Sequence, residues 1–165
     1  MRSLYEFLSI NAKESIIHAT DDTIRQIVKD ELDRLGLGAN LNHIDVSKVT
    51  DMSTNYYKKW HWGLFSVENK SNEEGFYGDV SEWDVSSVKD MKFMFHNCDK
   101  FNCDISGWNL EQCENTSDMF RGCSNFCQDL SSWNVKNVKT HDDMFYECPK
   151  MKDDMMPQFN FSFRK

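Results

Sequence analysis

Apolar residues recur along this chain with two periods, one of about three to four residues near the N-terminus and one of 25 residues further on. The first set consists of Ile24, Ile27, Val28, Leu32 and Leu35. These positions share one face of a helix, so the spacing predicts an amphipathic helix. Asp21 and Asp22 suit its positively polarised start, and Gly36 or Gly38 suits its end.

The second period begins after residue 40, where residues of the same type return every 25 positions. We call residues that are 25 apart a column. The clearest columns are Trp83, Trp108 and Trp133; Phe95, Phe120 and Phe145; and Cys98, Cys123 and Cys148. An earlier copy, IDVSKVTDMS at 44–53, matches WDVSSVKDMK at 83–92. It is followed by an insertion near 57–75.

A unit this short cannot bury its own rings, so it must stack on the next unit and extend one core. Stacked strands lie about 4.8 Å apart, which would bring the residues of a column into contact. We therefore interpret the nine column residues named above as a structural ladder. We expect short strands near Phe101–Ile105 and Phe126–Leu130, and a helical turn in each MF-x-x-C segment.

The segments SEWDVSSVKDMKFMFHNCDKFNCDIS and SSWNVKNVKTHDDMFYECPKM resemble the BspA-type leucine-rich repeat family. The likeness is strongest to the branch first noted in mycoplasma surface proteins, and it covers roughly residues 44–154. It implies an open, right-handed coil with a short strand per repeat, an interaction role and no catalysis. Thr116, His141 and Cys113 depart from the family pattern. The opening MRSLYEFL resembles the starts of proteins from phages of gut Bacteroides, which implies a phage or prophage source.

These patterns predict an α/β fold, namely a short leucine-rich-repeat-like right-handed solenoid with an N-terminal helical cap. Residues 1–40 would form the cap, because the first coil of a solenoid must be covered. Residues 41–154 would form about four repeats, and 155–165 a C-terminal tail or cap. SLYE at 3–6 is a capping-box pattern that places another helix start at Ser3. The alternative for this region is a separate docking or targeting helix.

The net charge and the cysteine content restrict the classes of binding partner and the cellular compartment that we expect. The formal net charge of −8 disfavours generic binding to nucleic acid or to an anionic membrane. No run of apolar residues is long enough to span a membrane, and the N-terminus lacks the pattern of a secretory signal. Six cysteines are then expected to be reduced, in the cytoplasm or in the host cytoplasm if a phage encodes the chain. Members of the resembled family are often on the cell surface.

Candidate metal and catalytic residues are explained more simply by packing. The cysteines lack the paired C-x₂-C spacing of structural zinc sites, and most fall on columns. A recurring aspartate at Asp79, Asp104, Asp129 and Asp154 supplies one carboxylate per unit, which more often caps its own backbone than binds a cation. No nucleophile or phosphate-loop motif is present. We therefore expect no cofactor, no metal and no enzymatic activity.

The insertion is where the 25-residue pattern stops explaining the residues. Aromatic and basic side chains gather there, and such residues dominate binding hot spots on loops. The candidate partner-binding residues are Tyr57, Lys58, Lys59, Trp60, His61, Trp62 and Phe65. The alternative is that these rings cover the first coil. Single-stranded nucleic acid is a third option, set against the acidic charge of the chain.

The sequence therefore predicts a non-enzymatic protein–protein interaction module whose protein partner it does not name. Self-association stays open, because the alternative function is a structural or assembly protein of a phage or virus particle that binds copies of itself. A zinc-binding or hydrolytic protein is a third hypothesis without a supporting motif.

Overall fold

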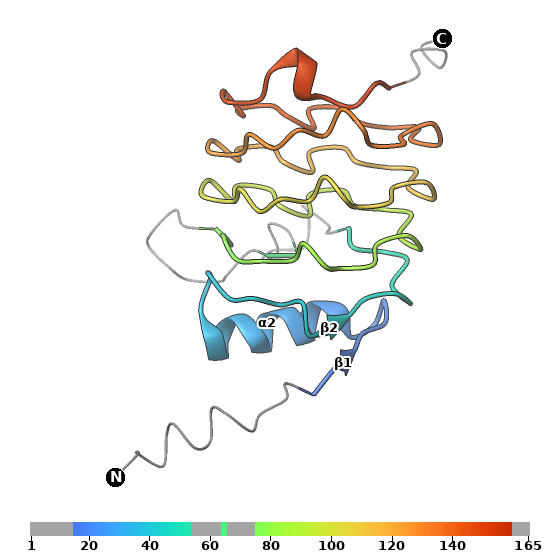
Figure 1. Ribbon diagram of the computed structural model, residues 1–165. Coiled ribbons are helices and arrows are strands. Elements are labelled where there is room, and N and C mark those ends of the chain that lie inside the picture. The colour runs from blue at the N-terminus through green and yellow to red at the C-terminus, as the bar shows by residue number, and fades with distance from the viewer. Residues whose placement is uncertain (1–14, 54–63, 66–74, 160–165) are drawn as a thin grey trace.

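The computed structural model describes residues 15–53, 64–65 and 75–159. Within them the chain winds through layers that are stacked along one axis, and the helix α2 lies beneath the first layer (Figure 1). The 3₁₀ turn at 153–155 lies at the opposite end of the stack. We number the layers from the helix: layer 1 comprises the described residues between 40 and 78, layer 2 is 79–103, layer 3 is 104–128 and layer 4 is 129–153.

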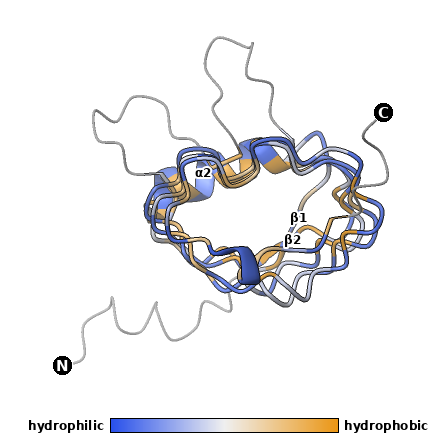
Figure 2. Ribbon diagram, turned by 90° about the horizontal axis from the view of Figure 1, so that it is seen from above, coloured by the Kyte–Doolittle hydropathy of each residue, from blue (hydrophilic) through white to orange (hydrophobic). Residues whose placement is uncertain are grey.

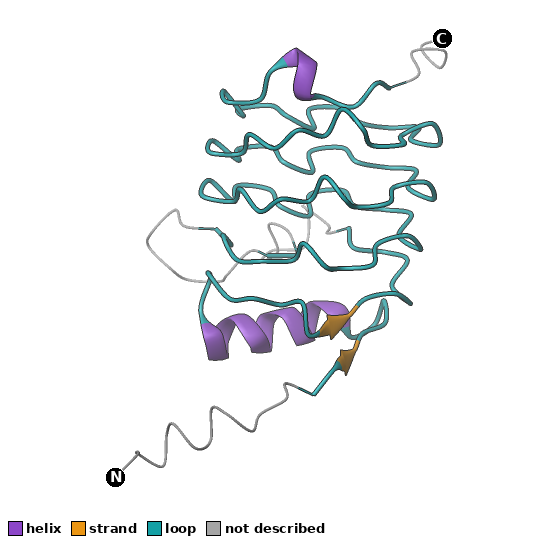
Figure 3. Cartoon of the chain, in the orientation of Figure 1, coloured by secondary structure: helices purple, strands orange, loops and turns teal. Residues whose placement is uncertain are grey.

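Regular secondary structure is sparse in the part of the chain that the structure describes (Figure 3). The helix α2 spans Ile24–Leu35, and β1 (Ile17–His18) pairs in parallel with β2 (Ile44–Asp45). A single 3₁₀ turn, η1, covers Asp153–Met155. The remaining described residues form turns, isolated bridges and irregular backbone. The prediction of an α/β, leucine-rich-repeat-like right-handed solenoid with an N-terminal helical cap is therefore wrong.

The physical reason lies in the backbone conformation of the layers. The strands expected near Phe101–Ile105 and Phe126–Leu130 do not form, and each MF-x-x-C segment is a series of turns rather than a helical turn. Two columns in this segment have left-handed backbone, which neither a helix nor a strand accepts. Their φ angles are 60° at Phe93, 55° at Asp118 and 53° at Asp143, then 59° at Asn97, 76° at Gly122 and 59° at Glu147.

Aspartate and asparagine side chains hold the bends of each layer. The carboxylates of Asp79, Asp104 and Asp129 each accept the N–H of the serine two residues later, at 2.9, 3.0 and 3.0 Å. This is the local turn for which short polar side chains are suited. The expectation that this column caps its own backbone is confirmed at these three residues. Asp154, the next member of the column, lies in η1 instead.

Backbone hydrogen bonds join each layer to the next. In layer 2 the N–H groups of Phe93, Phe95 and Asn97 donate to carbonyls of layer 3 at 3.2, 2.9 and 2.8 Å. The N–H groups between them turn back within the layer, as Met94 does to the carbonyl of Met91. Layer 3 donates to layer 4 in the same way from Thr116, Asp118, Phe120 and Gly122. Alternate N–H groups therefore bind the layers together without regular strands.

Figure 2 looks along the stack, where the layers lie over one another. Their buried apolar side chains form a single cluster, in which side chains of the same kind from successive layers contact one another. The rings of Phe65, Phe95, Phe120 and Phe145 stack with successive centroid distances of 4.9, 5.5 and 5.7 Å. Their planes lie within 4° of parallel. The indole N–H groups of Trp83, Trp108 and Trp133 donate to the buried carbonyls of Leu41, Val80 and Ile105 at 2.9, 3.2 and 3.1 Å.

The helix α2 closes the N-terminal end of this core. Ile24, Val28 and Leu32 are buried in the same apolar cluster as the layers, whereas Leu35 is 41% exposed. The helix ends at Gly36, whose φ of 89° lets its N–H bind the carbonyl of Leu32. The predicted helix and its glycine stop are confirmed, and Leu35 is the one member of the predicted stripe that faces solvent.

Gly122 provides a direct test of the left-handed positions. An alanine there would strain the backbone and press its Cβ against the side chain of Asn97. We expect Gly122→Ala to lower the free energy of unfolding by about 1–2 kcal/mol. Gly107 is the matched control, since a Cβ there meets nothing within 4 Å and its φ is not positive. Equal midpoints of urea denaturation for Gly122→Ala and Gly107→Ala would contradict the left-handed backbone at Gly122.

Candidate interaction surface

Most of the predicted binding loop lies outside the described residues. This applies to Tyr57, Lys58, Lys59, Trp60, His61 and Trp62, so the hypothesis stays a prediction for them. Phe65 is described and fully buried. Its ring stacks between Phe76, at 4.3 Å, and Phe95, at 4.9 Å. Phe65 therefore contributes to the core and not to an exposed surface.

The column cysteines are placed for packing and hydrogen bonding. The thiols of Cys123 and Cys148 donate to the carbonyls of Phe95 and Phe120 at 3.0 and 2.8 Å. Burial raises the pKa of Cys98 to about 12 and that of Cys148 to about 11, and it raises the pKa of Cys123 well above its usual value. The thiolate is the form that attacks a substrate or binds zinc, so these thiols are poor nucleophiles and poor ligands.

All six cysteines are free thiols. Among the described residues no group of three or more His, Cys, Asp or Glu side chains is arranged to hold a metal ion. The column cysteines are thus part of the core. We therefore look for a candidate binding surface at the ends and edges of the stack.

The two ends of the stack differ in how their backbone groups are used. α2 lies beneath layer 1, whereas the described residues after layer 4 do not form a fifth layer. In layers 2 and 3 the donors toward the next layer occupy fixed positions in the 25-residue unit. Their equivalents in layer 4 are His141, Asp143, Phe145 and Glu147. In the part of the chain that the structure describes, no hydrogen bond uses these four N–H groups.

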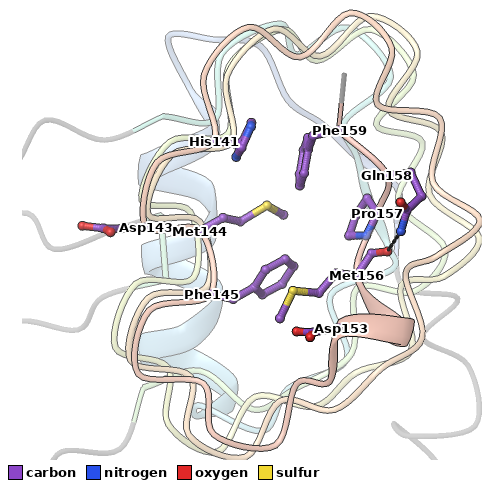
Figure 4. Close-up of a pocket in the computed structure, with 9 residues that line it drawn as sticks. All are labelled: His141, Asp143, Met144, Phe145, Asp153, Met156, Pro157, Gln158 and Phe159. Atoms are coloured by element: carbon purple, nitrogen blue, oxygen red, sulfur yellow. Dashed lines mark hydrogen bonds between the residues drawn. The ribbon is translucent and has the colours of Figure 1, made fainter. Parts of the chain in front are cut away.

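A pocket of about 380 Å³ lies beside these N–H groups (Figure 4). Met144, Phe145 and Met156 point into it, and Pro157 lies on its far side. Phe145 is the last ring of the phenylalanine stack, because Phe120 contacts one of its faces at 5.7 Å. Its other face is directed to the pocket, so the pocket occupies the place that a further layer would fill.

Phe159 enters the pocket from the C-terminal side. Its ring stacks on the imidazole of His141 with a centroid distance of 4.0 Å and an interplanar angle of 15°. Met155, Met156 and Phe159 are partly buried against the core. The chain after η1 therefore crosses the open end and covers it in part.

Layer 4 and the described residues after it expose more acidic than basic side chains. Five carboxylates from 141–159 are exposed, against the two lysines Lys150 and Lys152. The five are Asp142, Asp143, Glu147, Asp153 and Asp154. Asp143 points away from the pocket and forms an ion pair with Arg121 at 3.0 Å. The end of the stack thus combines backbone donors and an apolar pocket with an excess of acidic side chains.

A second pocket lies near Tyr77, and the polar side chains that line it already have hydrogen-bond partners. Tyr77 is 48% exposed, but the carboxylate of Asp79 in this pocket already accepts hydrogen bonds from Ser81 and Asn40. The thiol of Cys103 also donates to Asp79, at 3.5 Å. The polar groups here are paired with one another, so we place the candidate surface at the open end.

Sequence reasoning missed the open end. Its pocket is formed by turns of layer 4 together with residues after η1, and no residue-type pattern marks which N–H groups of a layer stay unused.

Comparison with known protein families matches the chain to a family model. The model, described as "Mycoplasma protein of unknown function, DUF285", covers residues 33–159. The chain belongs to this family. The region matched in this DUF285 protein includes all four layers and the pocket at the open end. No curated protein and no solved structure matches the chain. A search of the described residues finds no helix long and apolar enough to cross a membrane.

The buried thiols of the DUF285 protein yield a kinetic prediction. A raised pKa lowers the thiolate fraction, so Cys98, Cys123 and Cys148 should react at least a hundredfold more slowly with a thiol reagent at pH 8 in the native chain than in urea. The half-exposed Cys127 serves as the internal control and should react quickly. Mass spectrometry of the labelled peptides measures each site. Equal labelling rates at all six cysteines in the native protein would show that the thiols of Cys98, Cys123 and Cys148 are not buried.

Proposed function

We propose that this DUF285 protein is a non-enzymatic protein–protein interaction module and that the open end of layer 4 is its binding surface. The main support for the proposal is the row of four N–H groups in layer 4 that no described residue accepts, beside the apolar pocket on Phe145. In layers 2 and 3 the N–H groups at the equivalent positions donate to carbonyls of the next layer. A partner would bind by supplying carbonyls to the four N–H groups of layer 4.

The chemistry of the row restricts the partner. The row offers donors, so the partner must supply carbonyl oxygens, as an extended backbone segment does when it adds to the edge of a sheet. The same face also offers an acceptor, because the carbonyls of Lys89 and Glu114 accept N–H groups of the next layer and Lys139 is their equivalent in layer 4. The four-donor row itself is matched by the carbonyls of a different protein and not by the same row of a second copy, so we favour a different protein as the partner.

The remaining described groups support a binding role rather than catalysis. The recurring aspartates hold their own turns, and the column thiols have raised pKa values. A closer kinship with the BspA-type proteins and a cytoplasmic location are part of the same proposal. The resemblance of the columns supports the first, and the six free thiols support the second.

A pocket variant tests this function. Met156→Asp places a charge in the pocket at a residue that is only partly buried. We expect it to reduce the amount of bound partner at least tenfold, about 1.4 kcal/mol, because an apolar anchor would meet a carboxylate. The measurement is quantitative mass spectrometry of proteins captured from the native host by the whole chain, corrected for the folded fraction of each variant.

The matched control is Ser132→Asp, which adds the same charge to an exposed position of layer 4 outside the pocket. It should capture the partner as the wild type does. A partner captured equally by both variants would show that the open end is not the binding surface. The absence of any protein enriched by the wild type would contradict the interaction role itself.

A further inference from the structure

The pocket near Tyr77 is a second place where the chain can bind a ligand, and it lies apart from the open end. Its volume is about 500 Å³, a size typical of small-ligand sites. None of its lining residues also lines the pocket on Phe145, so the two pockets can be tested independently. The residues that line it are Gly38, Asn40, Tyr77, Gly78, Asp79, Ser81, Cys103 and Asp104.

Tyr77 gives this pocket an aromatic surface that is both exposed and held in place. Its ring lies against the backbone at Gly38, where a Cβ would come within 2.5 Å of a ring carbon. The N–H of Tyr77 donates to the carbonyl of Leu37 at 3.0 Å, which fixes the residue beside Gly38. About half of Tyr77 is nevertheless exposed. Such a ring can bind a cation over its face without first losing conformational freedom.

Both carboxylates of the pocket keep their negative charge although they accept hydrogen bonds. The N–H of Ser81 lowers the pKa of Asp79, and the hydroxyl of Ser106 lowers the pKa of Asp104. Burial raises the pKa of Cys103 to about 11, so its thiol stays protonated. The hydrogen bonds therefore stabilise the two charges without neutralising them. Their donors are neutral groups, namely the N–H and hydroxyl groups of Ser81 and Ser106, the amide of Asn40 and the thiol of Cys103.

The charge of the pocket selects the class of ligand. Two carboxylates line it, and none of its lining residues is lysine, arginine or histidine. In the part of the chain that the structure describes, no group of three or more potential ligands is arranged to hold a metal ion. An organic cation fits these groups better. A guanidinium is the best match, because it is planar, stacks on aromatic rings and pairs with carboxylates.

We propose that this pocket binds a guanidinium group, carried by an arginine of a protein partner or by a small free compound. The group would lie on the ring of Tyr77 and pair with Asp104. Both hydrogen bonds from Ser106 end on Oδ1 of Asp104, at 3.0 and 2.7 Å, so Oδ2 can accept an N–H of the guanidinium. Asp79 would contribute through its charge.

An NMR titration of the ¹⁵N-labelled full chain tests the proposal with two probes that carry the same group. The peptide acetyl-Gly-Gly-Arg-Gly-Gly-amide represents a protein partner, and methylguanidine represents a small free ligand. The amide signals of Tyr77, Gly78 and Asp104 should shift and saturate with at least one of them. Tighter binding of the peptide would assign the ligand to a protein, and tighter binding of methylguanidine would assign it to a free compound.

The neutral control probe is the same peptide with citrulline in place of arginine, which keeps the shape of the side chain and removes its charge. It should leave the three amide signals unchanged at the same concentrations. Equal shifts with the citrulline peptide, or no shift with either guanidinium probe, would overturn the proposal.

Two variants test the ring and the charge separately. Tyr77→Leu removes the ring and keeps an apolar side chain. Asp104→Asn removes one charge and keeps the turn, because Asn109 makes the same turn by accepting the N–H of Glu111 at 2.9 Å. We expect each variant to raise the dissociation constant of the tighter probe at least about threefold, the size of one exposed cation–ring or ion-pair contact. Unchanged amide signals in layer 4 would show that both variants are folded.

Asp129→Asn is the matched control. Asp129 belongs to the same column as Asp104 and accepts the N–H of Ser131 at 3.0 Å in the same kind of turn, but it does not line the pocket. Its loss changes the net charge of the chain by the same amount, and the probe should bind as it does to the wild type. Equal dissociation constants for Asp104→Asn and Asp129→Asn would overturn the proposal, because the pocket would then play no part in binding.

Discussion

Contact between residues that are 25 positions apart is the interaction on which the rest of this structure depends. Each layer is mostly irregular backbone, with too few internal hydrogen bonds to be stable alone. The N–H groups of Phe93, Phe95 and Asn97 bind carbonyls in the next layer, and the ring of Phe95 stacks on that of Phe120. Backbone bonds and ring contacts thus form between the same pair of layers. Loss of the register between layers would cost both at once.

Local geometry makes this register attainable. Aspartate turns bend the chain at fixed places, and left-handed residues such as Asn97 and Gly122 alternate the direction of the N–H groups. Half of these groups then point to the neighbouring layer. Non-glycine residues in this conformation carry a cost of about 1–2 kcal/mol each, which the contacts between layers must offset. The same geometry leaves layer 4 with donors that no described residue accepts, and the candidate surface follows from it.

The sequence was informative about contacts and less so about backbone path. The 25-residue spacing predicted which side chains contact one another in the core, because apolar residues that recur at a fixed spacing are usually buried together. It did not reveal the absence of strands, since a left-handed Phe93 or Glu147 has no residue-type signal. Asn97, Gly122, Asp118 and Asp143 have residue types that are compatible with this conformation, but such residues are also common in ordinary turns. The helix at 24–35 was readable from its apolar stripe and from Gly36. The pocket on Phe145 was missed because it depends on which segments cover layer 4. Phe65 was placed in a binding loop because it lies within the predicted insertion, outside the 25-residue spacing.

Amide hydrogen exchange tests most directly whether bonds between layers hold the molecule together. The account predicts that the amides of Phe93, Phe95, Phe120 and Gly122 exchange at least about a thousandfold more slowly than in an unfolded chain, although none of them lies in a helix or strand. They should exchange together, as one cooperative unit, because each layer depends on its neighbours. Exchange at the rates of unprotected loops would contradict the account, since irregular backbone without bonds between layers would behave in that way.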